Sequence, residues 1–234
     1  MNSPVRTAWI DIAQGYAGYL ATPPAGRGPG LVLFQEIFGV NEHIRALAEQ
    51  YALDGFTVLA PDIFWRQAPR VELGYEGAER ERARALMQAY AAADAPGDIV
   101  ASVQALRARP EVTGRVGAIG YCMGGRFAWL AAAAAGVDAA VAYYGGGIQT
   151  QLDRAPGIAC PLQFHYAERD EHIPLEAVER VRQATVGQGA ELHVYPGATH
   201  GFNCWARASY HAPSAAMAHG RTLAFLARHL MGAS

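Results

Sequence analysis

The feature that most constrains the fold of this chain is the pentapeptide Gly120-Tyr121-Cys122-Met123-Gly124. A largely apolar run precedes it at residues 115–119, and an alanine-rich run follows it at residues 123–135. The first run predicts a short buried strand and the second a buried helix. The turn between them must be so tight that only glycine fits two positions before and two positions after the cysteine. The sequence therefore predicts a strand, a strained turn that presents Cys122, and a helix.

The rest of the chain repeats this alternation of strand and helix. Buried strands are expected at residues 31–35, 56–60, 115–119, 139–144, 162–166 and 191–195, after an antiparallel pair at 7–13 and 16–21. Helices are expected at residues 79–93, 98–109, 123–135, 174–188 and 214–230, and between the cap Asn41 and Gly55. This alternation, with a tight cysteine turn, is typical of an α/β-hydrolase fold with a mostly parallel sheet and helices on both faces. We predict a single such domain over residues 1–234.

Composition argues against several kinds of partner and location. The net charge of −2 gives no sign of binding to nucleic acid or to an anionic membrane. The N-terminal segment lacks the apolar core of a signal peptide, and the longest apolar stretch, residues 127–135, is too short to span a bilayer. Three widely spaced cysteines argue against a disulfide framework. We expect a cytoplasmic protein.

Four reactive side chains each follow a predicted strand: Glu36, Cys122, Asp170 and His200. In parallel sheets, ligands bind outside the carboxyl ends of the strands. A cysteine thiol needs a base, and the base needs a third group that orients it. The chain order of nucleophile, acid and histidine is that of the α/β-hydrolase fold. We therefore predict Cys122 as nucleophile, Asp170 as the orienting acid and His200 as general base.

Nearby residues leave alternatives open for two of these roles. His172 follows Asp170 closely and is the main rival to His200, although a Gly-x-x-His-Gly turn after the last strand favours His200. Glu168 and Glu171 are the rivals to Asp170. Other histidines are expected to be structural where they lie in strands (His165, His193) and solvated where they lie on helices (His43, His219, His229).

The oxyanion hole is expected to use two backbone N–H groups, those of Met123 after the nucleophile and Ile37 after an early strand. Glu36 precedes Ile37 at the end of an apolar strand, where a carboxylate is costly to bury unless it is paired or protonated. One interpretation is a structural salt bridge with Arg45 or Arg80. The other is that the carboxyl group lies near the thiol and controls its protonation.

Several short motifs, spread from about residue 30 to the C-terminal helix, support a closer identification. They are Gln35-Glu36-Ile37-Phe38-Gly39-Val40-Asn41, Pro61-Asp62, Arg66-Gln67-Ala68-Pro69, Gly120-Tyr121-Cys122-Met123-Gly124-Gly125, Tyr143-Tyr144-Gly145, Asp170, and Gly197 three residues before His200. In these motifs the chain resembles the dienelactone hydrolase (carboxymethylenebutenolidase) family. The resemblance implies that Cys122 opens a lactone to a thioester. It also implies that Glu36 takes the thiol proton when the substrate binds.

The same resemblance implies a substrate carboxylate held by two arginines. Arg80 matches one of them, although Arg82 and Arg84 lie close by. The second is expected four residues after His200, where this chain has Cys204. A cysteine cannot make the forked contact that a guanidinium makes with a carboxylate. We therefore predict that the recognition of the anion is altered.

Other positions are also implied to bind the substrate. They include Phe38 and Tyr144, in addition to Arg80, Arg84 and Cys204. Arg207 or Arg84 is the nearest replacement for the missing arginine, and Met87 stands where a tryptophan is expected. Because the recognition of the anion is altered, we expect dienelactone itself to be a poor substrate and another lactone or an activated ester to be the real one.

The sequence leaves three other functions to compare with this one. A hydrolase fold can serve as a ligand-binding protein, although such proteins usually lack a complete triad. A thiol redox sensor would pair Cys122 with Cys204. A metal-dependent hydrolase is disfavoured, because His165 and His172 are not paired on a helix and no Cys/His cluster has ligand spacing. We predict a monomeric, cofactor-free and metal-free cysteine hydrolase acting on a small-molecule lactone or ester.

Overall fold

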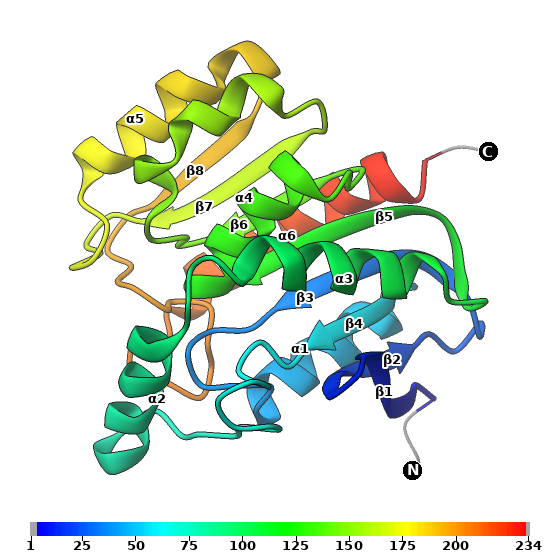
Figure 1. Cartoon of the computed structure of the whole chain (residues 1–234). Coiled ribbons are helices and arrows are strands. Elements are labelled where there is room, and N and C mark those ends of the chain that lie inside the picture. Colours follow the sequence, from blue (N-terminus) through cyan, green and yellow to red (C-terminus); the bar gives the residue numbers. More distant parts are fainter. Residues whose placement is uncertain (1–3, 233–234) are drawn as a thin grey trace.

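The computed structural model describes residues 4–232; residues 1–3, which begin the segment where no signal peptide is expected, and residues 233–234 lie outside this range. One sheet forms the centre, in the order β1-β2-β4-β3-β5-β6-β7-β8 (Figure 1). β2 pairs antiparallel with β1 and β4, and the other pairs are parallel, as predicted. The strands are β1 (Arg6–Ala13), β2 (Tyr16–Thr22), β3 (Gly28–Phe34), β4 (Thr57–Pro61), β5 (Val112–Tyr121), β6 (Ala140–Tyr143), β7 (Leu162–Ala167) and β8 (Glu191–Tyr195).

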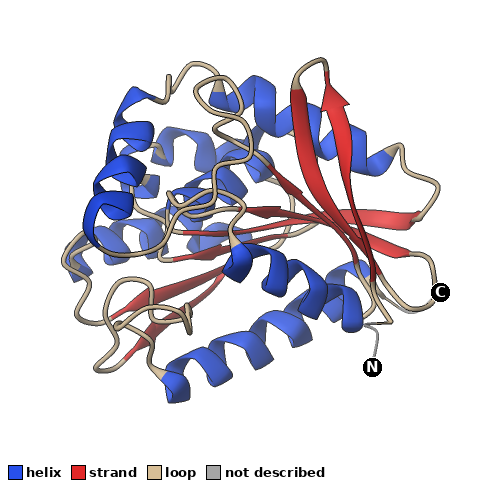
Figure 2. Ribbon diagram, turned by 90° about the horizontal axis from the view of Figure 1, so that it is seen from below, coloured by secondary structure: helices blue, strands red, loops and turns tan. Residues whose placement is uncertain are grey.

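Helices cover both faces of this sheet (Figure 2). They are α1 (Glu42–Leu53), α2 (Gly77–Ala89), α3 (Ala95–Arg107), α4 (Met123–Ala134), α5 (Leu175–Thr185) and α6 (Ala212–Leu230). Residues 4–232 also contain three short 3₁₀ segments: η1 (Ile148–Thr150), η2 (Leu152–Gly157) and η3 (Val186–Gln188). The last of these forms the end of the helix predicted over residues 174–188. Asn41 caps α1 as predicted, because its side chain accepts a hydrogen bond from the N–H of Ile44 at 3.2 Å.

Helix boundaries differ from the prediction by a few residues at several ends, and two of these differences have clear local reasons. α2 ends at Ala89, because Tyr90 has an extended backbone and its ring packs against Phe127. α3 begins at Ala95, earlier than predicted, because Pro96 fits the first helical turn, where its missing N–H would have no intrahelical partner. Both changes leave the order of elements as predicted.

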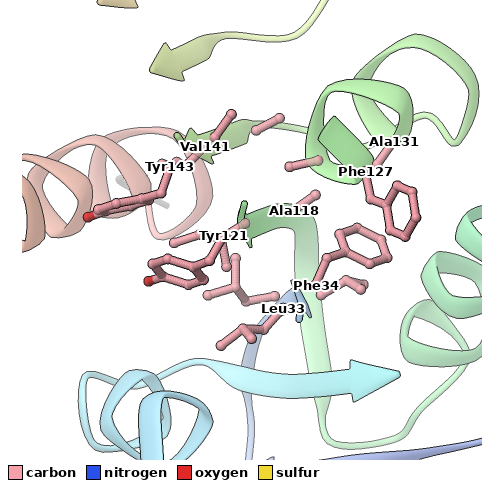
Figure 3. Packing of buried hydrophobic residues seen from close by; sticks show 14 of the residues in the cluster. Leu33, Phe34, Ala118, Tyr121, Phe127, Ala131, Val141 and Tyr143 are labelled. Carbon is pink, nitrogen blue, oxygen red and sulfur yellow. The ribbon is translucent and has the colours of Figure 1, made fainter. Parts of the chain in front are cut away.

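The central strands carry the core that holds the cysteine turn in place. On one face of the sheet, Phe34 of β3 meets Phe127 of α4 edge-on, with ring centroids 6.0 Å apart (Figure 3). Tyr121 of β5 and Tyr143 of β6 lie away from that pair and contact each other, with ring centroids 4.7 Å apart. The Tyr143 hydroxyl also forms a 2.7 Å hydrogen bond with Thr222 of α6. The strand that ends at the turn is therefore packed by helices from both sides.

His43 of α1 is buried, which corrects the expectation that it is solvated. Only 3% of the residue is exposed, and its ring meets Trp205 edge-on with centroids 4.1 Å apart. Burial, with a smaller effect from the positive charge of Arg207, lowers the pKa of His43 to about 4. The folded protein therefore keeps this imidazole neutral at mildly acidic pH.

This burial makes stability depend on pH. His43 stays neutral in the folded chain down to about pH 4, whereas the unfolded chain binds a proton near pH 6.5. The contribution of neutral, buried His43 to the free energy of unfolding is thus complete above pH 6.5 and is lost as the pH falls from 6.5 towards 4. We expect the free energy of unfolding to fall between pH 7.5 and 5, with about 2 kcal/mol of the fall due to His43. Urea unfolding of His43→Gln should show a fall in the free energy of unfolding between pH 7.5 and 5 that is about 2 kcal/mol smaller than in the wild type. A fall as large as in the wild type would contradict the assignment.

Candidate active site

Cys122 occupies the predicted strained turn between β5 and α4. Its φ of 56° and ψ of −116° lie in a region that residues other than glycine rarely adopt. A Cβ on Gly120 would overlap the carbonyl group of Gly124, and a Cβ on Gly124 would overlap the carbonyl oxygen of Phe34 in β3. The two glycines are therefore needed for the turn, which places Cys122 at the N-terminus of α4, where the helix dipole favours negative charge.

Gly124→Ala should destabilise the fold, because the new methyl group would push α4 away from β3. We expect a loss of about 2–3 kcal/mol in the free energy of unfolding, measured by urea titration. Gly220→Ala is the matched control, since Gly220 lies in α6 and an added Cβ meets no atom within 4 Å. The control should be neutral or slightly stabilised. Equal behaviour of the two variants would contradict the packing described here.

His200 and Asp170 come together from the loops after β8 and β7. The imidazole Nδ1 lies 2.8 Å from Asp170 Oδ2, and both residues are buried. The other carboxylate oxygen, Oδ1, accepts hydrogen bonds from the backbone N–H groups of His172 at 2.9 Å and Ile173 at 3.2 Å. Because both oxygens are engaged, the carboxylate is fixed and Nδ1 donates to it. This leaves Nε2 as the nitrogen that can accept a proton.

The ring of His200 is held between two aromatic neighbours. Tyr144 and His172 each meet it edge-on, with centroids 5.1 Å and 5.0 Å away. Its Nε2 is buried and has no hydrogen-bond partner among the described residues. Burial lowers the pKa of His200, but the negative charge of Cys122 as thiolate and the hydrogen bond to Asp170 outweigh it and raise the pKa to about 10. His200 therefore binds a proton more tightly than a free imidazole does.

Glu36, just after β3, is 1% exposed and pairs with Arg207. Its Oε1 lies 3.2 Å from Arg207 Nη1, while Oε2 has no hydrogen-bond partner among the described residues. Burial raises the pKa of Glu36, and the positive charge of Arg207 opposes the rise without cancelling it. This corrects the expected partner: Arg45 pairs with Glu72 instead, and Arg80 forms no salt bridge within residues 4–232.

A cleft of about 370 Å³ opens over Cys122. Several predicted site residues line it: Ile37, Phe38, Arg80, Arg84, Cys122, Met123 and His200. It is also lined by Arg207, His172 and Met87, which the sequence indicated as alternatives or departures from the family pattern. The N–H groups of Ile37 and Met123 donate no hydrogen bond to any described residue. Both groups are thus free to meet a ligand oxygen at the cleft wall.

α2 contributes one wall of this cleft. It lies beyond the carboxyl ends of the strands (Figure 1), and Ala83 is its only fully buried residue. Arg80, Arg84 and Met87 line the cleft and follow a spacing of four and three residues, which places them on one face of the helix. The helix therefore presents two guanidinium groups and a thioether to the site from a largely solvated position.

Two residues predicted to bind substrate lie behind the cleft wall. Tyr144 and Cys204 are both fully buried and do not line the cleft. The positive φ of Tyr144, 36°, turns its ring towards His200 and Phe202. The N–H of Cys204 donates to the carbonyl oxygen of Gly201, in a tight turn. Neither side chain lines the cleft in this structure, so their contact with a substrate stays a prediction.

Arg126 lines the cleft and was missed in the sequence. It lies in the first turn of α4, four residues after Cys122, so that one helical turn brings it back to the same side as the cysteine. That spacing was the available signal. Gly146 and Gly147, after β6, complete this side of the cleft.

The cysteines give no support to a redox pair. Cys122 and Cys204 are both free, and burial, with the nearby charge of Glu36, raises the pKa of Cys204 to about 12. A thiol that stays protonated is a poor partner in disulfide exchange. Within residues 4–232, no group of three or more His, Cys, Asp or Glu is arranged to hold a metal ion, and no helix is long and apolar enough to cross a bilayer.

Comparison with known proteins is consistent across sequence and structure. The model of the dienelactone hydrolase family matches residues 16–230. Carboxymethylenebutenolidase of Pseudomonas putida is 36% identical over 224 residues, which cover 92% of this chain and 94% of that protein. Carboxymethylenebutenolidase 1 of Cupriavidus pinatubonensis is 33% identical over 215 residues, covering 91% of each. A solved structure from Klebsiella pneumoniae superposes with a TM-score of 0.83 at 32% identity, over 96% of this chain and 99% of that one.

Proposed function

This chain belongs to the dienelactone hydrolase family and is a lactone or ester hydrolase, and we propose that Cys122, His200 and Asp170 perform its reaction through an acyl-enzyme thioester. The observation that carries this proposal is that His200, held by Asp170 at 2.8 Å, lines the same cleft as the strained Cys122. A nucleophile, a base and an orienting acid are the parts that acyl transfer requires.

In the proposed first step, the thiol proton of Cys122 passes to His200 Nε2, Sγ attacks the carbonyl carbon and a C–S bond forms. The backbone N–H groups of Ile37 and Met123 stabilise the oxyanion. When the C–O bond breaks, His200 Nε2 gives its proton to the leaving oxygen. Water then attacks the thioester, His200 accepts the water proton, and the thiolate leaves as the acid is formed. Asp170 holds the Nδ1 proton throughout.

Glu36 and Arg207 are proposed to link the activation of the thiol to substrate binding. The family pattern places an arginine four residues after the histidine, where this chain has Cys204. Arg207 lines the cleft, so it can supply the guanidinium group that this position lacks. A substrate carboxylate would draw Arg207 away and leave Glu36 buried without its partner. The raised pKa of Glu36 and its unpaired Oε2 support its taking up a proton at that moment. Substrate binding would then raise the share of Cys122 that is thiolate above its share in the free enzyme.

Glu36→Gln tests this link, since the amide keeps the shape and removes the proton acceptor. We expect kcat/KM for a carboxylated lactone to fall about 100-fold, and kcat/KM for an uncharged aryl ester to fall less. Glu176→Gln, an exposed change in α5, is the control and should match the wild type. A Glu36→Gln enzyme with unchanged kinetics on the lactone would exclude a proton-transfer role for this residue.

The acyl-enzyme itself can be detected directly. After mixing with a slowly hydrolysed aryl ester and quenching in acid, intact-protein mass spectrometry should show one added acyl group, and peptide mapping should place it on Cys122. Full turnover with no adduct on this cysteine, under conditions where deacylation limits the rate, would contradict the proposed mechanism.

A further inference from the structure

The cleft carries more positive charge than one carboxylate can balance. Four of its lining residues are arginines (Arg80, Arg84, Arg126, Arg207), and none is an aspartate or glutamate. Glu36 partly balances Arg207 from behind the wall. The pair of Arg84 with Glu81 at 3.2 Å is exposed, where ion pairs contribute little. Within residues 4–232, Arg80 and Arg126 form no salt bridge. Such a cleft favours ligands with more than one negative charge.

Two of these guanidinium groups lie on opposite sides of the sulfur. The sheet order places β5 between β3 and β6 (Figure 1). Arg207 lies at the β3 side, paired with Glu36 and 5.6 Å from the ring of Phe38. Arg126 lies at the β6 side, against Gly147, and Cys122 follows β5 between them. A carbonyl group bound at the sulfur therefore has one positive group along the cleft in each direction.

The loop after β6 is shaped to hold Arg126. Gly147 has a φ of +89°, and a Cβ there would lie 3.2 Å from Arg126 Cδ and 3.3 Å from Nη1. A Cβ on Gly145 would lie 3.2 Å from the Arg126 backbone nitrogen. The bare loop thus lets the side chain of Arg126 lie along it within the cleft wall. An arginine held in this way loses less conformational entropy when it binds an anion.

We infer that Arg126 forms a second carboxylate-binding subsite and that the preferred substrates are lactones or esters with an anionic group on each side of the scissile carbonyl. One carboxylate meets Arg207, and the other meets Arg126. This inference deepens the proposed function and rests on it for the position of the carbonyl group. Recognition at both ends would align the carbonyl over the sulfur.

Binding is tested without turnover, in the Cys122→Ala protein. Isothermal titration with α,ω-dicarboxylates from succinate to suberate, against monocarboxylates of the same carbon number at constant ionic strength, should show a dicarboxylate that binds at least about 10-fold more tightly. Arg126→Met in this background should abolish the preference. Arg82→Met, which removes an exposed charge of α2 that does not line the cleft, should retain it. Equal binding of mono- and dicarboxylates, or a preference that survives Arg126→Met, would overturn the inference even if the hydrolase function stands.

Turnover separates anion binding from a general effect of Arg126. Four esters form the test: butyrate and hemiglutarate, each with a 4-nitrophenyl or a 3-carboxy-4-nitrophenyl leaving group. In the wild type, the ester with carboxylates at both ends should have the highest kcat/KM. Arg126→Met should lower kcat/KM about 10-fold or more for the two esters that carry a carboxylate on the same arm, either the acyl or the leaving group, and by a clearly smaller factor for the neutral ester. An equal fall on all four esters would overturn the subsite, because Arg126 would then act on the thiol or on folding.

Discussion

Cys122→Ala is expected to lower kcat for an activated aryl ester or lactone by about 10⁴-fold or more. Without the sulfur no acyl-enzyme can form, and only binding and the oxyanion-hole donors remain to assist water. Initial rates followed by release of the phenol measure the loss. The side chain is partly exposed in the cleft and adds little to the core, so the variant should unfold close to the wild-type temperature.

Cys160→Ala is the matched control for that experiment. Cys160 is also a partly buried free cysteine. It precedes the N-terminal end of β7, whereas the cleft lies beyond the carboxyl ends of the strands. It should keep wild-type turnover. If Cys122→Ala remains as active as Cys160→Ala, the nucleophile lies elsewhere and the proposed chemistry is wrong.

His200→Ala should lower kcat by about 10³-fold, because the thiol loses the group that accepts its proton. The rate at which iodoacetamide alkylates Cys122 should fall as well, which reports on the thiolate without substrate. His172→Ala is the informative comparison, since its ring also lines the cleft and contacts His200 edge-on. We expect a fall of less than about 10-fold there. The reverse order of the two effects would make His172 the base.

Elements and their order followed from local pattern. The run from β5 through Cys122 into α4 was predictable because its two glycines, its buried strand and its alanine-rich helix are all set within about twenty residues. The strand ends also indicated which loops meet at one edge of the sheet, and this brought Glu36, Asp170 and His200 into one hypothesis. Parallel topology carries that information without any knowledge of side-chain contacts.

Contacts between distant loops did not follow in the same way. The pair of Arg207 and Glu36 joins positions 171 residues apart, and no local pattern indicates that these two side chains pair. Tyr144 and Cys204 were placed in the cleft by their motifs, yet backbone turns direct both inward. The helical pattern predicts that His43 lies on the exposed side of α1, but Trp205, from a distant loop, packs over its ring. Each of these depends on packing that only the folded chain defines.

The weak anchoring of α2 has a consequence for how such an enzyme diversifies. Arg80, Arg84 and Met87 meet the cleft from a helix in which only Ala83 is fully buried. Exchanges at those three exposed positions change the ligand-facing surface at a cost to folding of a few tenths of a kcal/mol. Selection for a new lactone can therefore proceed through α2 while the cysteine turn and its packed sheet stay unchanged.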